Sequence, residues 1–389
     1  MKNISENKSP LRFVLLLGFV SLFADMTYEA ARSITGPYLA ILGASATAVG
    51  VVAGFGELIG YGLRIIFGIV TDRTGRYWTI TILGYAVNLL AVPALALARN
   101  WEVAAVFIMA ERFGKAVRTP ARDAMLSHAA HGMGRGWAFG IHEAMDQIGA
   151  MIGPIIVMAV LAWNGSYPYA FAVLIIPAIL ALTILAIARA TYPDPGRLEP
   201  SFTRKPDDRL GPIFWLYLTA IACIAFGFAD FPLAAFHMKT TAVVADKWIP
   251  LIYAGAMGVD AISALILGRL YDKIGLKVLM GVVLLSAWSA PLIFLSGSGL
   301  LIAGMVLWGI GMGALESIVR AVVAGIVGPE RRATGFGIFN AGFGFAWFAG
   351  SAVMGILYDL SLTAMVGIAV FAQLLSLPFL VTVHRRQAK

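Results

Sequence analysis

Long apolar stretches fill most of the chain, and turn residues and short clusters of charge interrupt them. A helix needs about 20 mostly apolar residues to cross the hydrocarbon core of a bilayer. By that measure the sequence predicts twelve membrane-spanning helices. We expect them near residues 12–36, 46–70, 78–98, 102–126, 137–162, 167–189, 212–237, 248–269, 277–297, 300–325, 335–357 and 363–383. Most connecting loops are short, so consecutive helices should run antiparallel.

The connection between the sixth and seventh predicted helices differs from the others. Residues 190–211 are rich in proline and charge, a composition typical of a linker. The sequence therefore predicts an N-terminal six-helix bundle over residues 1–189, a cytoplasmic linker over 190–211 and a C-terminal six-helix bundle over 212–389.

Composition supports a membrane protein. Hydrophobic residues make up 60% of the chain and charged residues 13%, with a mean hydropathy of +0.84. Soluble domains average about 45–50% apolar and about 25% charged residues. The net charge of +8 is spread over short basic clusters, so it does not indicate a nucleic-acid surface. Most of these clusters fall on one side of the predicted helices, which predicts an inner (cytoplasmic) cell membrane protein with both termini cytoplasmic.

The two halves of the chain share sequence patterns. "GIVTDRTGR" at 68–76 corresponds to "GRLYDKIGLK" at 268–277, and "RGWAFGI" at 135–141 corresponds to "RATGFGI" at 332–338. "FAD" occurs at both 23–25 and 228–230. Three matches in the same order, at offsets near half the chain length, indicate a duplicated six-helix unit.

These motifs resemble the major facilitator superfamily over the whole chain. Its pattern G-x-x-x-D-R-x-G-R between the second and third spans is present as Gly68, Asp72, Arg73, Gly75 and Arg76, with Asp272 as the counterpart of Asp72. The resemblance implies an all-α fold of two pseudo-symmetric six-helix bundles around a central cavity, working by alternating access. It also implies that this motif gates the cytoplasmic side, where a carboxylate can dock at a helix N-terminus.

The fifth predicted helix partly matches an antiporter pattern of that family. Gly140, Gly149, Gly153 and Pro154 keep its spacing, whereas Val157 and Met158 stand where its final glycines would be. Close helix packing and a kink are the plainer explanation of these residues. An antiport role is the alternative.

Charges inside the apolar helices are the main candidates for function, because a charge at mid-bilayer costs about 2.5–3.5 kcal/mol on insertion scales. Asp25, Glu29 and Arg32 fall on one stripe of the first helix and should face the bundle interior. A plain ion pair between Glu29 and Arg32 is the structural alternative. Helix direction places Asp25 and Arg112 at similar depth, so we expect these two to meet.

The fourth and fifth predicted helices complete a network of opposed charges. Lys115 and Arg118 should lie at about the depth of Glu143 and Asp146. We hypothesise that Asp25, Glu29 or Asp146 exchanges a proton during transport, with Arg112 as a displaceable partner. Further cavity candidates are a Glu57–Arg64 pair on the second helix, Asp230, Asp260, and a possible Glu316–Arg320 pair.

These features favour a proton-coupled exporter of a small organic molecule. Import of a small anion is the alternative, because Arg32, Arg112, Lys115, Arg118 and Arg122 are suited to hold a carboxylate or phosphate. A membrane enzyme is disfavoured, since no H-E-x-x-H, G-x-S-x-G or Walker sequence is present. A transporter-like receptor is a more distant alternative. We expect a monomer that uses the proton gradient and needs no metal or cofactor.

Overall fold

The structure is a computed structural model that describes residues 9–129, 135–193, 210–327 and 332–387. Most of the predicted linker, residues 194–209, lies outside the described residues. The predicted boundaries of the two bundles and the linker therefore stay a prediction.

The described residues of the first half of the chain form seven helices and one 3₁₀ turn. They are α1 (Pro10–Ile41), α2 (Ala46–Thr74), α3 (Tyr77–Ala94), η1 (Leu95–Leu97), α4 (Trp101–Ala129), α5 (Arg135–Asn164), α6 (Tyr167–Val173) and α7 (Ile175–Thr191). Each of the six predicted spans in this half coincides with α1, α2, α3, α4, α5 or the α6–α7 pair.

The second half repeats this organisation with more interruptions. Its helices are α8 (Pro212–Gly227), α9 (Phe231–Thr240), α10 (Ile249–Ile274), α11 (Lys277–Ser286), α12 (Ser289–Phe294), α13 (Ser298–Ile326), α14 (Arg332–Leu360) and α15 (Leu362–Gln387), and the turn η4 (Asp246–Trp248) precedes α10. The seventh and ninth predicted spans are each divided into two helices, α8–α9 and α11–α12.

The break between α8 and α9 has a local cause. Asp230 adopts an extended conformation as the N-cap of α9, and its side chain accepts a hydrogen bond from the Phe231 backbone N–H at 2.9 Å. Pro232 follows in the first turn of α9, where its missing N–H costs nothing. The predicted span over 212–237 is confirmed, but it is divided into two helices, because a capping carboxylate and a proline start a new helix inside the apolar stretch.

Eleven helical segments of the described chain are long and apolar enough to cross a membrane. α4 is not among these apolar segments although it has 29 residues, ample length to span the hydrocarbon core at 1.5 Å per residue. Its charges line the protein interior, as described below. The predicted all-α fold with twelve spans is confirmed.

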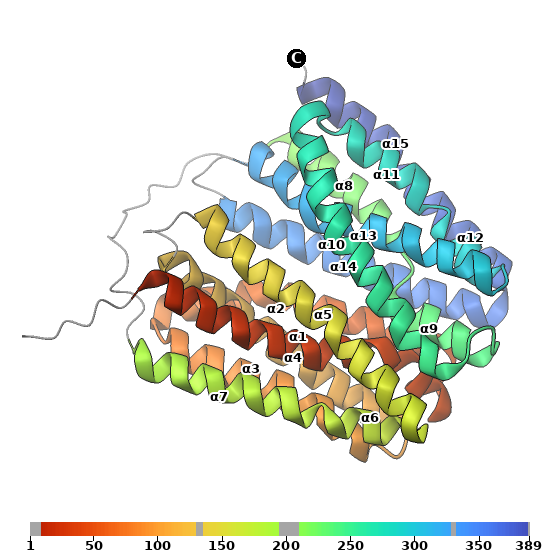
Figure 1. The fold of residues 1–389 in the computed structure, drawn as a ribbon. Helices are drawn as coiled ribbons and strands as arrows, with labels where there is room; N and C mark the ends of the chain where they lie inside the picture. Colours follow the sequence, from red (N-terminus) through yellow and green to blue (C-terminus); the bar gives the residue numbers. More distant parts are fainter. Residues whose placement is uncertain (1–8, 130–134, 194–209, 328–331, 388–389) are drawn as a thin grey trace, which may run out of the picture.

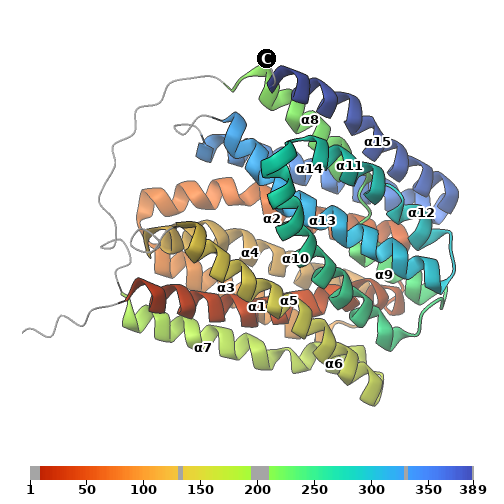
Figure 2. The ribbon, with the colours of Figure 1, turned by 45° about the horizontal axis from the view of Figure 1, so that its top comes forward.

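Figures 1 and 2 show α1–α7 gathered in one bundle and α8–α15 in the other. We call the end of the molecule where α1 begins and α15 ends the terminal side, and the other end the opposite side. The bundles meet where α2 packs on α14, α1 on α9 and α5 on α10. Near the opposite side the contact is tight: a Cβ added at Gly36 of α1 would lie 2.0 Å from the Pro232 carbonyl oxygen of α9.

Candidate transport site

A central cavity of about 400 Å³ lies between the two bundles. Its N-terminal wall comes from α1, α2, α4 and α5, and its C-terminal wall from α10, α13 and α14. Asp123 near the end of α4 and Glu143 and Phe336 near the starts of α5 and α14 also line it, so the cavity extends toward the terminal side. Closure at the opposite side and a cavity at the terminal side are what alternating access requires of one of its two states.

The charged stripe of α1 faces the protein interior. Asp25 is 6% exposed and Glu29 is 8% exposed, and both line the cavity with Arg32. Glu29 and Arg32 do not pair with each other. Glu29 accepts a hydrogen bond from the Tyr253 hydroxyl of α10, and Arg32 Nη2 lies 2.9 Å from Asp230 Oδ1. Two of the three charges of this stripe therefore bind partners in the other bundle.

A layer of ion pairs crosses the N-terminal bundle next to these contacts. Glu57 Oε1 lies 3.3 Å from both Arg32 Nη2 and Arg112 Nη2, and Arg112 Nε lies 3.2 Å from Glu111 Oε2. Asn88 donates to Glu111 Oε1 at 2.8 Å. We call Arg32, Glu57, Glu111 and Arg112 the ion-pair layer.

This layer corrects two expected pairings. Arg112 does not meet Asp25, and Glu57 pairs with Arg32 and Arg112 in place of Arg64. The reason is local: Gly56 of α2 lies against the Arg112 side chain, 3.0 Å from Cγ when a Cβ is added, so Arg112 of α4 reaches the neighbouring Glu57 on α2. The Arg64 guanidinium lies 4.7 Å from the centre of the Tyr61 ring, and both side chains line the cavity.

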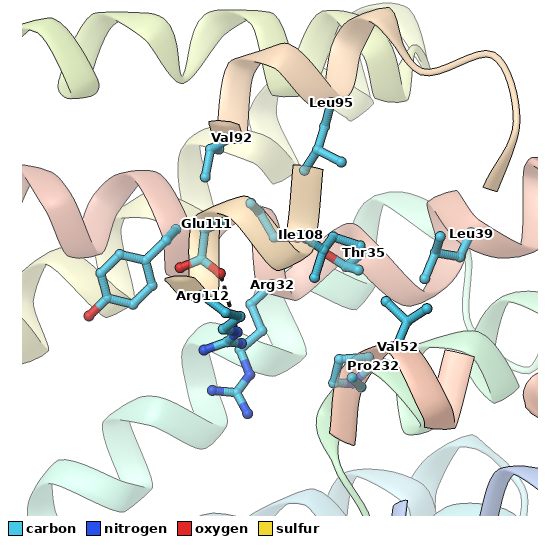
Figure 3. Close-up of a pocket in the computed structure, with 13 residues that line it drawn as sticks. Arg32, Thr35, Leu39, Val52, Val92, Leu95, Ile108, Glu111, Arg112 and Pro232 are labelled. Atoms are coloured by element: carbon cyan, nitrogen blue, oxygen red, sulfur yellow. Dashed lines mark hydrogen bonds and ion pairs between the residues drawn. The ribbon is translucent and has the colours of Figure 1, made fainter. Parts of the chain in front are cut away.

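A smaller pocket of about 30 Å³ lies beside the ion-pair layer (Figure 3). Arg32, Glu111 and Arg112 line it on one side, and the apolar side chains of Val92, Leu95 and Ile108 on another. Arg32 and Arg112 also line the central cavity. The layer therefore lies between the polar central cavity and a mostly apolar pocket, which Pro232 of α9 also lines.

Two carboxylates lie where α1 meets α5: Asp25 is buried, and the side chain of Asp146 is 17% exposed. The Oδ1 atoms of Asp25 and Asp146 are buried and have no hydrogen-bond partner among the described residues, and the two charges act on each other. His142 Nδ1 lies 3.4 Å from Asp146 Oδ2. Glu143, one residue after His142, is exposed and lines the cavity. His142 was missed by the sequence analysis, although its i, i+4 spacing from Asp146 was a usable signal.

The α5 glycines explain why these carboxylates lie together. A Cβ at Gly149 would lie 2.2 Å from the Leu22 carbonyl oxygen, and one at Gly153 would lie 2.4 Å from the Met26 carbonyl oxygen. The backbones of α1 and α5 therefore touch on either side of Asp25. Pro154 lies inside α5, and Gly140 lies in a part of α5 whose side-chain surroundings are not described.

The basic residues of α4 fall into two groups. Arg122 pairs with Asp123 at 2.8 Å and donates to Ser21 Oγ at 3.2 Å. Lys115 and Arg118 instead lie against aromatic rings: Lys115 Nζ is 3.9 Å from the Tyr28 ring centre, and Arg118 Cζ is 4.2 Å from the Tyr85 ring centre. Neither has an ion pair or hydrogen bond with the described residues, although both line the cavity.

The C-terminal wall of the cavity is mainly apolar and aromatic. It contains an aromatic row on α14, Phe336, Phe339, Phe343 and Trp347. The rings of Phe343 and Trp347 are 5.4 Å apart. Two carboxylates, Asp260 and Glu316, also line this wall. The side chain of Arg320, predicted to pair with Glu316, lies outside the described residues.

The predicted gating motif lies at the terminal side. Gly75 ends α2 with a φ of 63°, and Gly275 ends α10 with a φ of 64°; this left-handed conformation suits glycine. Arg73, Arg76 and Asp272 are exposed. The side chain of Asp72 lies outside the described residues, and Gly68 is near Pro120 on α4. The gating role of this motif stays a prediction.

A carboxylate does dock at a helix N-terminus on the opposite side. Asp359 near the end of α14 accepts hydrogen bonds from the backbone N–H groups of Ala46 at 3.2 Å and Thr47 at 2.8 Å, and from the Thr47 hydroxyl at 2.6 Å. These groups begin α2, where unpaired N–H groups and the helix dipole favour an anion. The sequence analysis missed this contact between the two bundles, which we call the Asp359 latch.

Two helical bundles around a polar cavity define a membrane transporter. The chain belongs to the Major Facilitator Superfamily, whose model matches residues 15–245 and 235–389. It is a secondary transporter and not an enzyme, and the resemblance deduced from its motifs is confirmed.

Relatives are similar along nearly their whole length. An uncharacterised protein of Mycobacterium tuberculosis is 42% identical over 376 residues, covering 95% of this chain and 92% of the relative. An uncharacterised MFS-type transporter of Methanocaldococcus jannaschii is 25% identical over 369 residues, covering 92% of each chain.

Solved transporters share the fold. A bacterial homologue of the human lysosomal transporter Spinster, in an inward-facing and unoccupied conformation, aligns with a TM-score of 0.70 at 15% identity, covering 97% of this chain and 96% of that one. The nucleoside transporter NupG aligns with a TM-score of 0.73 at 14% identity, covering 94% of this chain and 99% of that one.

Proposed function

We propose that this transporter is a proton-coupled exporter of a small organic molecule, and that Asp25 and Asp146 form its proton-binding site. The observation that carries the proposal is that buried Asp25 and partly buried Asp146, where α1 packs on α5, each have a buried oxygen that lacks a hydrogen-bond partner among the described residues. A buried carboxylate without such a partner is costly while charged, and a proton removes that cost. The cavity gives this site access to the terminal side.

The position of Asp25 on α1 supports coupling between the proton and the conformational change. Glu29, four residues on, binds Tyr253 of the other bundle, and Arg32 binds Asp230. Opening the opposite side requires both contacts to break. A change of charge at Asp25 therefore acts on the same helix that holds the two bundles together.

The fifth-helix pattern supports export. Gly149 and Gly153 place the α5 backbone against the α1 backbone next to Asp25, so the residues of the antiporter pattern also build the proposed proton site. In an antiporter, proton binding at this site would favour release of the substrate and rocking of α1 against the C-terminal bundle.

Proton movement in sealed liposomes tests this proposal. Purified protein is reconstituted into liposomes that contain the pH-sensitive dye pyranine, and compounds from a metabolite panel are added outside. Antiport predicts that an imported compound drives protons out, so the lumen becomes alkaline. Compounds that enter without changing the lumenal pH would contradict proton coupling.

Proton-coupled import of an anion is a second candidate. Lys115 and Arg118 favour it, because both line the cavity and neither has an acidic partner at ion-pair distance among the described residues. Arg32, Arg112 and Arg122 do not add to this argument, since carboxylates already neutralise them. In the liposome experiment, symport predicts an acidic lumen in place of an alkaline one.

We also propose that the terminal side is cytoplasmic in the inner membrane, on the distribution of Lys and Arg along the sequence. Green fluorescent protein fused after Lys389 should fluoresce in bacterial cells, and alkaline phosphatase at the same place should be inactive. The reverse pattern would place the terminal side outside.

A further inference from the structure

Arg118 is an unusual residue even within this charged cavity. Its side chain is 1% exposed, and its Nε and Nη1 atoms have no hydrogen-bond partner among the described residues. A buried guanidinium without an acceptor is costly. Buried Arg112 and partly buried Arg32, on the same wall, each have carboxylate partners.

The surroundings hold Arg118 in place. A Cβ added at Gly84 of α3 would lie 2.6 Å from the Arg118 backbone nitrogen, so α3 and α4 are in direct contact there. The guanidinium lies 4.2 Å from the Tyr85 ring centre and 5.6 Å from the Tyr28 ring centre. Tyrosine faces stabilise a cation but leave its N–H groups available. Arg118 is therefore a positioned donor that lacks an acceptor among the described residues.

Carboxylates line the same cavity as this donor. Asp25 is one turn before Tyr28 on α1 and lines the cavity with Arg118. Asp146 lies next to Asp25, and both carboxylates have a buried oxygen without a hydrogen-bond partner among the described residues. Donor and acceptor groups of opposite charge thus flank Tyr28 on the N-terminal wall.

The facing wall offers apolar contact. Phe336, Phe339, Phe343 and Trp347 of the aromatic row line the same cavity. A ligand that satisfies both walls has a positive and a negative group at one end and an apolar or aromatic group at the other. Ligand sites commonly combine apolar walls with a few placed polar groups in this way.

We propose that the central cavity binds an amphipathic zwitterion whose carboxylate pairs with Arg118, whose ammonium pairs with Asp25 and Asp146, and whose apolar group packs on the aromatic row. This inference rests on the proposed proton-coupled exporter and names its substrate class. It also gives the coupling a physical cause, because an ammonium and a proton compete for the same carboxylates. A bidentate contact from arginine is suited to the carboxylate.

Binding to the purified full-length protein in detergent tests the two poles separately. The probes are L-phenylalanine, L-phenylalaninamide and 3-phenylpropionate, which share a ring and a carbon skeleton; the second lacks the carboxylate and the third lacks the ammonium. Titration calorimetry at about pH 7 keeps the amines mostly protonated and limits competition from protons at Asp25 and Asp146. Phenylalanine should bind at least about tenfold more tightly than either analogue, which corresponds to a difference of about 1.4 kcal/mol in binding free energy.

Single substitutions test which residue causes each binding preference. Arg118→Gln should abolish the preference for phenylalanine over phenylalaninamide and keep its preference over 3-phenylpropionate. Asp25→Asn should abolish the preference for phenylalanine over 3-phenylpropionate and keep its preference over phenylalaninamide. Arg189→Gln and Glu102→Gln change exposed charges and should leave both preferences intact.

Two results would overturn the zwitterion site: equal binding of the three probes, or no binding of phenylalanine, by the wild-type protein. An Arg118→Gln protein that still prefers phenylalanine to its amide would show that Arg118 is not part of the site. If Arg118→Gln fails to fold, Arg118→Lys replaces it in the same comparison. Because binding is measured without a gradient, the outcome is independent of coupling. Probe binding without any lumenal pH change in liposomes would reject the proposed function and leave the site standing.

Discussion

Arg32 of α1 and Asp230 at the start of α9 form an ion pair of 2.9 Å that joins the two bundles. Asp230 also caps α9 through its bond to the Phe231 N–H. A single carboxylate thus fixes the break in the seventh span and holds that break against α1.

Removing the charge of Asp230 should weaken the closed opposite side. Asp230→Asn keeps a capping side chain, because asparagine is as good an N-cap as aspartate, but it loses the ion pair with Arg32. We expect spin labels at the opposite-side ends of α2 and α14 to show an increased population at long distance. Double electron–electron resonance measures this distribution. An unchanged distribution would show that the ion pair does not stabilise closure.

The Asp359 latch should contribute to the same closure by a separate contact. Asp359→Ala removes the acceptor for Ala46 and Thr47, and helix caps are worth about 0.5–2 kcal/mol. The population open at the opposite side should therefore rise by roughly twofold to thirtyfold, read by the same labels.

Ser45→Ala is the matched control for the latch. The Ser45 hydroxyl caps α2 from within, accepting from the Ala48 N–H at 3.1 Å, and makes no bond to the other bundle that the structure describes. It should reduce the stability of α2 without opening the opposite side. Equal opening in both variants would assign the effect to α2 itself.

The contact between α1 and α5 should not tolerate a side chain at Gly149. In Gly149→Ala the new Cβ meets the Leu22 backbone oxygen at 2.2 Å, and backbone cannot move aside as a side chain does. Overpacking typically costs about 1–3 kcal/mol, so the unfolding midpoint in detergent should fall. Gly62→Ala on α2, where nothing lies within 4 Å of the added Cβ, should unfold close to the wild-type temperature.

Neutralising the proposed proton site should uncouple transport. Asp25→Asn and Asp146→Asn cannot exchange a proton, so we expect substrate flux in liposomes to become independent of an imposed pH gradient. Exchange of labelled for unlabelled substrate across the membrane should persist at least in Asp146→Asn. If both variants still concentrate substrate against its gradient when a pH gradient is imposed, the proton site lies elsewhere.

The twelve spans could be predicted because the apolar composition of each stretch indicates a lipid environment, whichever helices it packs against. The interruption at Asp230 could not be predicted, since Asp230 lies among apolar residues that favour a continuous helix. Only the cap geometry reveals the break. α4 was placed correctly in spite of its charges, because flanking turns and the spacing of its neighbours bounded it.

Partners of charged side chains were harder to predict than the direction in which they face. Periodicity placed Asp25, Glu29 and Arg32 on one stripe, and the structure places all three at the cavity. It gave no information on which residue each side chain reaches: Arg112 of α4 pairs with Glu57 of α2, and Glu29 binds Tyr253 at a separation of 224 residues. Such contacts depend on which ends of the bundles are closed, a property of the conformational state that helix periodicity does not contain.

The polarity of α4 has a consequence for how the protein is made. This helix carries buried Arg112 and Arg118, and helices with several central charges partition poorly into lipid on their own. During synthesis α4 must therefore find Glu57 and the tyrosines of α1 and α3 as it leaves the translocon. Membrane integration of the fourth segment is thus a cooperative event that depends on the three segments made before it.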